Sequence, residues 1–171
     1  KAVPARGYLA VNTVPGAVSG WDEAFRLSRE SMGSPLSWAE LLDAARGYAE
    51  DGFAVGHSLA HWLAVDTSGQ GAGRGLHQFP AFLEVFCKEN GRPYAEGEIL
   101  RQPDLAQSLA RLAQNGADEF YHGGIARAIA DSMMLHSGLL TVGDLADHHA
   151  DWAEPLRVPY RDLTACSAPP N

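Results

Sequence analysis

Along most of the chain the apolar residues recur at steps of three and four, the spacing that gathers them on one face of a helix. The clearest example is an apolar stripe within residues 38–51. Its members are Leu41, Leu42, Ala45, Tyr48 and Ala49. Ser37 and Glu40 have the spacing of a capping box, and Gly52 follows the stripe. The pattern predicts a helix that starts after Ser37 and packs its stripe against another element.

Shorter stripes of the same kind predict further helices. They cover residues 20–32, 58–65, 80–87, 103–115, 117–122, 125 to about 138, and a last helix that starts at Thr141. Leu105, Leu109 and Leu112 share one face of the helix at 103–115. Gly33 is placed to end the first helix in a left-handed conformation. Most of the chain is therefore expected to be helical.

Strand patterns occur only near the two ends of the chain. Residues 7–18 alternate loosely and contain Pro15 and Gly16, which predicts a short strand entering a turn. Residues 156–158 and 163–166 are joined through 159–162 and predict a hairpin. No internal repeat or domain linker interrupts the pattern. The expected fold class is mainly α with short β segments at the ends, in a single domain of residues 1–171.

Composition narrows the class of protein further. The chain has 171 residues, of which 46% are hydrophobic and 20% charged, as in globular domains. Its net charge of −8 disfavours binding to nucleic acid or to an anionic membrane. It contains neither an apolar run that could span a bilayer nor the pattern of a signal peptide, so a soluble protein is expected. The start at Lys1 and the end at Ala168–Asn171 suggest a piece excised from a longer protein.

One segment partly matches the motif of a catalytic serine. Gly56, Ser58 and Ala60 stand where a G-x-S-x-G nucleophile elbow has its first glycine, serine and last glycine. The last glycine is missing, and residues 50–55 are too polar for the buried strand that an elbow needs. Ser58 is therefore expected to be the N-cap of a helix rather than a nucleophile.

The histidines offer only weak metal-binding patterns. His57 and His61 lie four residues apart, on one helix face, and His77 could complete a set of three. The spacing lacks the internal glutamate of a metalloprotease, so ordinary exposed or core histidines are the favoured interpretation. The adjacent pair His148 and His149 cannot easily bind one ion and is expected to be polar surface.

The remaining candidate features also carry no chemistry. The glycine-rich loop at 69–75 lacks the lysine and the hydroxyl residue of a phosphate-binding loop, so it is expected to be a mobile linker. Cys87 lies in an apolar stretch, where a buried thiol is unreactive, and Cys166 forms no C-x-x-C pair. No carboxylate pair stands out for acid–base chemistry. The sequence thus assigns no catalytic, cofactor-binding or metal-binding residue and implies no cofactor.

Several segments, taken in order, resemble the large subunit of the gamma-glutamyltransferase (gamma-glutamyltranspeptidase) family, which also includes cephalosporin acylases. Together they span the chain from about Val11 to Pro170. The segments are Val14–Trp21, Leu36–Trp38 with Glu40–Leu42, Ala49–Phe53, Leu100–Ala106, Gly116–Tyr121 with Gly123, Leu140–Thr141 with Asp144–Leu145, and Glu154–Leu156 with Tyr160–Arg161. Residues 57–78 match least well.

The resemblance implies a fragment of an N-terminal-nucleophile hydrolase, whose complete fold is a four-layer αββα sandwich. Such a precursor cleaves itself, and the new N-terminal threonine of the small subunit attacks a gamma-glutamyl amide of a small molecule such as glutathione. The family's substrate-binding arginine precedes the segment resembling Val14–Trp21, and the threonine lies beyond Pro170. Neither residue is in this chain, so the fragment alone is expected to be inactive, with the rest of the precursor as its partner.

Two other classes of protein stay open. An independent helical binding module requires the stripes on 38–49, 105–112 and 125–133 to cover one another, and a serine hydrolase using Ser58 lacks the necessary alternation of strands and helices. An acylase of the same family is a further alternative. Helices that belong on an absent sheet leave apolar surface exposed, so a homodimer of the fragment is expected. The sequence indicates no compartment.

Overall fold

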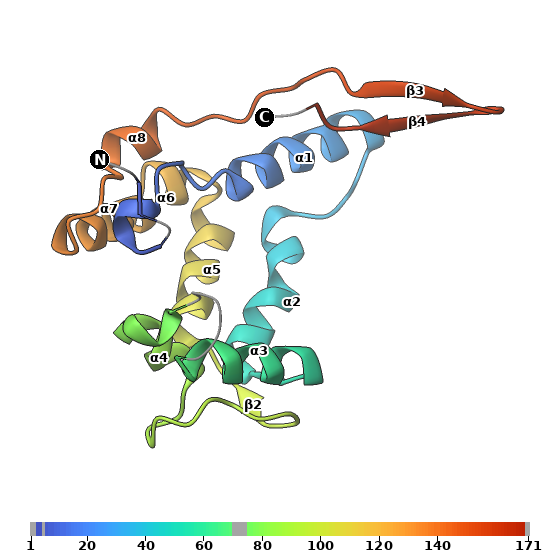
Figure 1. Ribbon diagram of the computed structural model, residues 1–171. Coiled ribbons are helices and arrows are strands. Elements are labelled where there is room, and N and C mark those ends of the chain that lie inside the picture. The colour runs from blue at the N-terminus through green and yellow to red at the C-terminus, as the bar shows by residue number, and fades with distance from the viewer. Residues whose placement is uncertain (1–2, 5, 70–74, 170–171) are drawn as a thin grey trace. The chain divides into compact units, whose positions relative to one another are not determined.

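The computed structural model describes residues 3–4, 6–69 and 75–169, and it is mainly helical (Figure 1). The helices within these ranges are α1 (Ala17–Met32), α2 (Trp38–Asp51), α3 (His57–Thr67), α4 (Pro80–Phe86), α5 (Pro103–Asn115), α6 (Asp118–Tyr121), α7 (Gly124–Leu135) and α8 (Val142–Ala146). Short 3-10 helices cover Tyr8–Ala10 and Leu76–Gln78, and the strands are β1 (Phe53–Ala54), β2 (Ile99–Leu100), β3 (Leu156–Tyr160) and β4 (Leu163–Ser167). None of the helices drawn from these ranges is both long and apolar enough to cross a membrane.

The helix ends follow the local signals in the sequence. Ser37 and Glu40 form the predicted capping box at the start of α2, and Thr141 forms another with Asp144 at the start of α8. Gly33 ends α1 in the left-handed conformation, with φ of 66°. These signals act within one turn of the chain, so they are satisfied whatever the rest of the fold does.

The prediction of a strand within residues 7–18 is wrong. The segment forms the 3-10 helix Tyr8–Ala10 and then runs irregularly into α1. A strand needs a neighbour to accept its backbone hydrogen bonds, and no described strand pairs with this segment. Loose alternation alone therefore did not decide its structure.

The chain divides into two compact units, one of residues 35–119 and the other of residues 1–34 together with 120–171. In the 35–119 unit α2 packs along α5, and the indole of Trp38 donates a 2.8 Å hydrogen bond to the carbonyl of Leu112. The antiparallel pair β1–β2 brings Phe53 opposite Leu100, which is fully buried. Gly52 joins α2 to β1, and a Cβ there would lie 2.6 Å from Ile99 Cγ2, so only glycine fits.

The buried face of α5 differs by one position from the predicted one. Leu109 and Leu112 are buried as expected, but the third buried residue is Ala106. Leu105 keeps 45% of its surface exposed. Ala106 and Leu105 are neighbours at the edge of one helix face, and the packed side of α5 includes the alanine and leaves the leucine half exposed.

The unit of residues 1–34 and 120–171 has its own apolar core. Ala126, Leu140 and Leu145 are buried at its centre. Partly buried side chains of Val14, Phe120, Ile129 and Met133 pack around them. The stripe of α7 is thus covered in part by α8 and the loop before it. The predicted stripe of α2 is covered only in part, because Leu42 and Ala49 are buried while Leu41 and Tyr48 stay 48% and 64% exposed.

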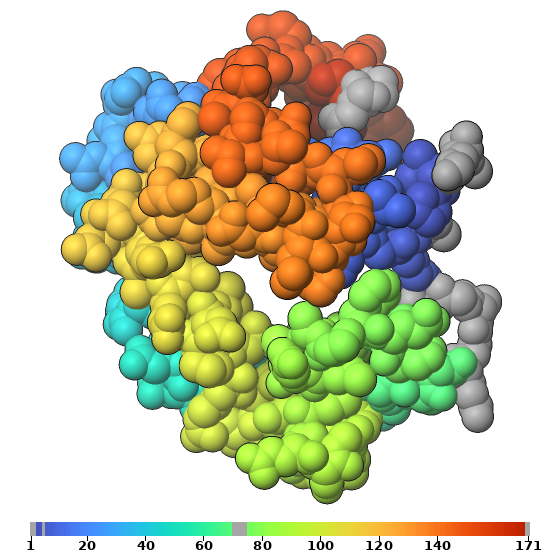
Figure 2. All heavy atoms as spheres, turned by 90° about the vertical axis from the view of Figure 1, so that its left-hand side faces the viewer, coloured from blue at the N-terminus to red at the C-terminus, as the bar shows by residue number. Residues whose placement is uncertain are grey.

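The outer surface of α7, the following loop and α8 remains apolar in part. This region faces the viewer in Figure 2, coloured orange. Its exposed large apolar side chains are Met134, Leu135, Leu139 and Val142. Four exposed large apolar side chains within nine residues are unusual for a surface that is exposed only to solvent.

The predicted hairpin is present and slightly longer than expected. β3 and β4 pair antiparallel from Leu156 opposite Ser167 to Tyr160 opposite Leu163, and the turn consists of residues 161–162. All ten strand residues are exposed. The hairpin therefore has a defined register but contributes nothing to the apolar core.

Candidate functional site

Ser58, the residue of the partial nucleophile motif, lies on the surface of α3 and lacks a catalytic partner. The helix begins at His57 with Gly56 as its N-cap, so the prediction that Ser58 caps the helix is wrong. β1 ahead of it has only two residues, and the Ser58 side chain makes no hydrogen bond in the described part of the chain. A serine nucleophile needs a base within hydrogen-bond reach. The structure provides none for Ser58.

The three histidines considered as metal ligands have different surroundings. His57 is 87% exposed at its side chain, and its Nδ1 lies 3.0 Å from Glu96 Oε2. The ring of His61 meets the neighbouring Trp62 edge-on, and His77 lies in the 3-10 helix Leu76–Gln78. Within residues 3–4, 6–69 and 75–169, no three His, Cys, Asp or Glu side chains are grouped to hold a metal ion.

One well-connected polar cluster centres on Tyr121, which is buried at the end of α6. Its hydroxyl donates to the carbonyl of Pro15 at 2.8 Å and accepts from the backbone N–H of Ser19 at 2.9 Å. The Ser19 hydroxyl donates to Gly16 O, and its Oγ lies 3.0 Å from His148 Nε2. The Tyr121 ring also stacks on His148, with 5.2 Å between ring centroids. These contacts hold the turn before α1 in place.

His148 therefore differs from the polar surface residue that the sequence suggested. It is half-buried and packs so closely on the turn before α1 that a Cβ on Gly16 would lie 3.3 Å from its Nε2. Only His149 is exposed, with its Nε2 3.3 Å from Asp151. The pair Ser19–His148 resembles a nucleophile with its base in distance alone, because the serine proton is directed to the Gly16 carbonyl. Its role is structural.

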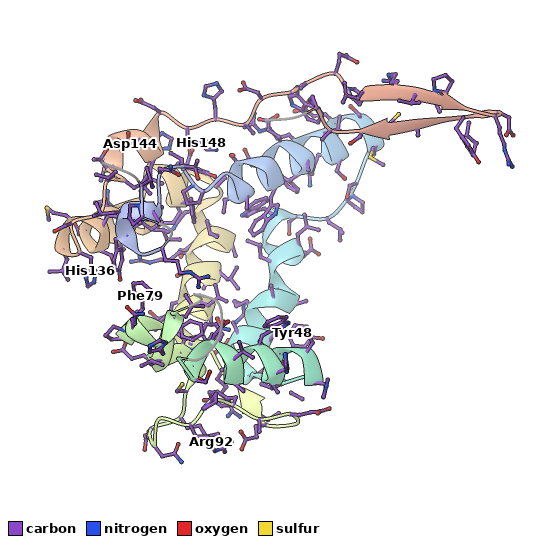
Figure 3. The ribbon with its side chains drawn as sticks, viewed as in Figure 1. Tyr48, Phe79, Arg92, His136, Asp144 and His148 are labelled. Carbon is purple, nitrogen blue, oxygen red and sulfur yellow. The ribbon has the colours of Figure 1, made fainter. Side chains whose placement is uncertain are left out.

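A charged network organises the loop between α4 and β2. Glu98 accepts hydrogen bonds from Arg92 at 2.8 Å and from the backbone N–H of Ala95 at 2.8 Å, and Lys88 also contacts its carboxylate. Arg92 is labelled in Figure 3. These donors, Arg92 first, lower the pKa of Glu98 from its ordinary 4.5 to about 2. Glu98 therefore stays ionised and shapes the loop.

The thiol candidate and the glycine loop add no reactive group. Cys87 is buried at the end of α4, and burial raises the pKa of its thiol. A thiol with a raised pKa is a poor nucleophile. Residues 70–74 of the glycine-rich loop lie outside the described residues.

A small hollow of about 230 Å³ lies between the segment before α1 and the loop before α8. Its lining residues are Val11, Asn12, Thr13, Val14, Leu139, Leu140 and Asp144. The Asp144 carboxylate already accepts hydrogen bonds from the backbone and hydroxyl of Thr141. The hollow thus offers no buried charged group to a ligand.

Sequence reasoning missed Tyr121 and Glu98, which organise the two most connected polar networks described here. Tyr121 and its partner Ser19 stand in two of the family-like segments, but they are 102 residues apart, and nothing in either segment shows that the two meet. Glu98 had a signal in the run of alternating charges from Lys88 to Glu98. Neither network assembles a nucleophile, a base and an oxyanion site, so the chain alone contains no complete catalytic centre among the residues described.

Comparison with known proteins places these elements in a longer molecule. The sequence model of the family described as gamma-glutamyltranspeptidase matches residues 1–171. The chain is 40% identical over 170 residues to the oxamate amidohydrolase proenzyme of Klebsiella pneumoniae, and the match covers 99% of this chain and 31% of that protein. It is 37% identical over 165 residues to the glutathione hydrolase proenzyme of Pseudomonas aeruginosa, covering 91% of this chain and 25% of that protein.

Solved structures agree in fold. The gamma-glutamyltranspeptidase of Helicobacter pylori superposes with a TM-score of 0.85 at 29% identity, covering 98% of this chain and 45% of that one. A cephalosporin acylase from Bacillus halodurans superposes with a TM-score of 0.81 at 31% identity, covering 98% of this chain and 30% of that one. The chain thus spans about a third of the length of the curated relatives it matches.

Proposed function

The chain belongs to the gamma-glutamyltranspeptidase family, and on that premise we propose that it is part of the large subunit of an enzyme that hydrolyses or transfers gamma-glutamyl groups. Glutathione-type amides are the substrate class. The main observation in support is that the family's sequence model matches the whole chain. Two relatives named glutathione hydrolase proenzyme are also 37% and 38% identical to it. The scattered segments identified in the sequence were therefore parts of one family pattern.

In this proposal the chain provides scaffold and the chemistry lies elsewhere in the protein. An N-terminal threonine, exposed by self-cleavage of the precursor, attacks the amide carbonyl, and its own amine takes the hydroxyl proton. Backbone N–H groups hold the oxyanion, and an arginine ahead of this chain binds the substrate carboxylate. The two units described here contribute packed helices that position neighbouring segments.

The partner that follows from the proposal is the remainder of the same precursor. Several relatives are named proenzymes, which indicates a precursor that is processed. The small subunit is expected to carry the nucleophilic threonine and to pack against apolar surface that this chain leaves exposed. The single structural domain predicted for residues 1–171 then belongs to a larger domain shared with that subunit.

A second candidate is hydrolysis of an amide that carries no gamma-glutamyl group. The specific observation in its favour is the 40% identity to an oxamate amidohydrolase proenzyme over 99% of this chain. Proteins named as acylases are also 36% and 33% identical to it. The self-cleaved threonine would perform the same acyl chemistry on a smaller or different acyl group.

The deciding experiment expresses the complete gene that contains this sequence. We expect the product to split into two chains and then to release nitroaniline from a gamma-glutamyl anilide, with glycylglycine as acceptor to separate transfer from hydrolysis. Oxamate and a cephalosporin amide are assayed beside it. Cleavage with activity on oxamate alone would favour the second candidate, and a stable uncleaved product with full activity would reject both.

This chain expressed without the rest of the gene is the matched control. It lacks the proposed nucleophile and arginine, so it should release no nitroaniline above a buffer blank. Release that is lost in Ser58→Ala would instead support the serine-hydrolase alternative.

A further inference from the structure

The exposed hairpin β3–β4 has two edges that differ in what they offer to another strand. We propose that the free edge of β4, and not that of β3, receives a β-strand from the rest of the precursor. The inference rests on the proposal that the chain is part of a larger family precursor. It is drawn from the register of the hairpin and the position of one proline.

The register determines which backbone groups point away from the hairpin. In an antiparallel pair, residues whose N–H and C=O bond across the ladder alternate with residues whose groups point outward. The two-residue turn at 161–162 makes Tyr160 and Leu163 a hydrogen-bonded pair. Pro159 is therefore at an outward position, which agrees with its having no N–H to give to the ladder.

Pro159 weakens the outer edge of β3. Besides Pro159, the other outward position on this five-residue strand is Arg157. Half of the outward N–H groups are thus missing from β3, and a proline ring stands where an incoming strand would approach. Proline at an outward edge position is a common way in which proteins keep a strand edge unpaired.

The outer edge of β4 has no such block. Thr164 lies opposite Pro159 and Cys166 lies opposite Arg157, so both point their backbone groups outward. Each keeps its N–H, and Thr164 is β-branched, which suits a paired strand. A strand added here would gain donors and acceptors along the whole length of β4.

The side chains of the hairpin indicate that it is incomplete. Residues opposite each other point to the same face, so Leu156, Val158 and Tyr160 share one face with Leu163 and Ala165. The four large side chains among these are 53–67% exposed. A two-stranded sheet is only marginally stable in water and needs a third strand or a covered face.

The length of the relatives identifies the occupant as precursor chain. The Helicobacter pylori structure matches 98% of this chain, which leaves no room for a ten-residue hairpin to be unmatched, and the match covers only 45% of the chain in that structure. More than half of such a molecule is therefore available to cover the hairpin. Within the described residues, β3 and β4 pair only with each other.

Hydrogen–deuterium exchange on the full-length protein tests the edge directly. We expect the amides of Thr164 and Cys166 to be protected at least about 100-fold relative to the amide of Arg157. Exchange at Thr164 and Cys166 as fast as at Arg157 would overturn the proposal, as would equal protection of Arg157. Protection that falls on dilution would assign the edge to a second copy of the protein and would also overturn it.

Two proline variants provide a matched pair in the full-length protein. Cys166→Pro removes an outward N–H from β4, and Arg157→Pro removes the opposite one from β3. Each also removes one side of the same weak contact, Arg157 Nη1 to Cys166 Sγ at 3.8 Å. We expect Cys166→Pro to lower the thermal midpoint by several degrees and Arg157→Pro to leave it within about 1 °C. Equal effects would contradict the proposal.

The outcome is separate from that of the substrate assay. A protected β4 edge in a processed protein without gamma-glutamyl activity would reject the proposed substrate and keep this inference. An enzyme that is active on gamma-glutamyl substrates but has an unprotected β4 edge would keep the proposed substrate and reject this inference. If Cys166→Pro fails to fold, the exchange measurement on the unmodified protein still decides.

Discussion

At the scale of single residues, the side chains with the most catalytic appearance in the sequence are the least constrained in the structure. Ser58 and His61 are exposed on α3, and the 87% exposed side chain of His57 lies against Glu96 at the surface. Tyr121 and Glu98 carry no motif, yet each joins several partners. Burial and hydrogen bonding, rather than likeness to a catalytic motif, therefore identify the residues whose substitution should lower the stability of the protein.

Removing the hydroxyl of Tyr121 should destabilise the protein. Tyr121→Phe leaves the N–H of Ser19 and the carbonyl of Pro15 without this partner, and the expected loss in unfolding free energy is about 1–3 kcal/mol. Urea unfolding measures it. Tyr48→Phe is the control, because Tyr48 is 64% exposed and its change should stay within about 0.5 kcal/mol. Equal losses in the two variants would show that the Tyr121 contacts contribute nothing.

Glu98 should give the protein a pH-dependent stability. Its pKa of about 2 lies below its ordinary 4.5, so its carboxylate stabilises the folded state above pH 4.5, and this contribution is lost as the pH falls toward 2. Glu98→Gln should therefore lower the urea midpoint at pH 7 and much less at pH 3. Glu96→Gln, which touches only exposed His57, serves as the control. A deficit of Glu98→Gln that is unchanged between pH 7 and pH 3 would contradict the assignment.

At the scale of elements, local patterns decide where helices begin and end, while packing decides which face is buried. The capping boxes at Ser37 and Thr141 form as their spacing predicts. The buried face of α5, in contrast, includes Ala106 and leaves Leu105 half exposed. A periodic pattern defines an apolar stripe to within about one position, and packing against neighbouring elements determines which residues of the stripe are buried.

Two leucines of α5 should respond differently to truncation. Leu109→Ala removes a buried side chain from the packed face of α5 and should cost about 2–5 kcal/mol in unfolding free energy. Leu105→Ala changes a residue that is 45% exposed and should cost markedly less. Chemical denaturation of both variants decides. A change below about 0.5 kcal/mol in Leu109→Ala would show that its face is not packed.

At the scale of the whole molecule, the chain leaves more apolar surface exposed than a self-sufficient protein usually does. Exposed large apolar side chains occur along much of the described chain, and two groups of them lie on the hairpin and on the segment from Met134 to Val142. The chain also spans only about a third of the curated relatives it matches. α2 packs along α5, but Leu41 and Tyr48 of the predicted α2 stripe and Leu105 of the α5 stripe stay exposed. The stripes therefore do not cover one another as the independent-module alternative requires, and these surfaces favour a partner.

Expressed by itself, the chain should form a dimer. Uncovered apolar patches tend to meet around a twofold axis, and the net charge of −8 is screened within about 8 Å at physiological salt. Light scattering over a hundredfold dilution measures the mass. Val158→Asp places a charge on the apolar hairpin face and should shift the equilibrium toward monomer. A strict monomer that also fails to bind an apolar dye would favour the independent module.

The sequence by itself determined the helical class, the limits of most helices to within a few residues, and a hairpin joined through residues 159–162, which the structure narrows to a turn at 161–162. Each of these depends on residues within a few positions of one another, such as a capping pair or a glycine with positive φ. The family pattern, read from segments in order, also came from sequence alone. The sequence did not identify a catalytic residue, because the proposed nucleophile lies outside this chain.

Only the tertiary structure decided which distant groups meet. The contacts of Tyr121 with Pro15 and Ser19 bridge more than a hundred residues, and no local pattern marks them. The same holds for the half-buried state of His148 and for the failure of residues 7–18 to form a strand. Backbone and side-chain donors are satisfied by whatever the fold brings near, so these outcomes depend on long-range packing.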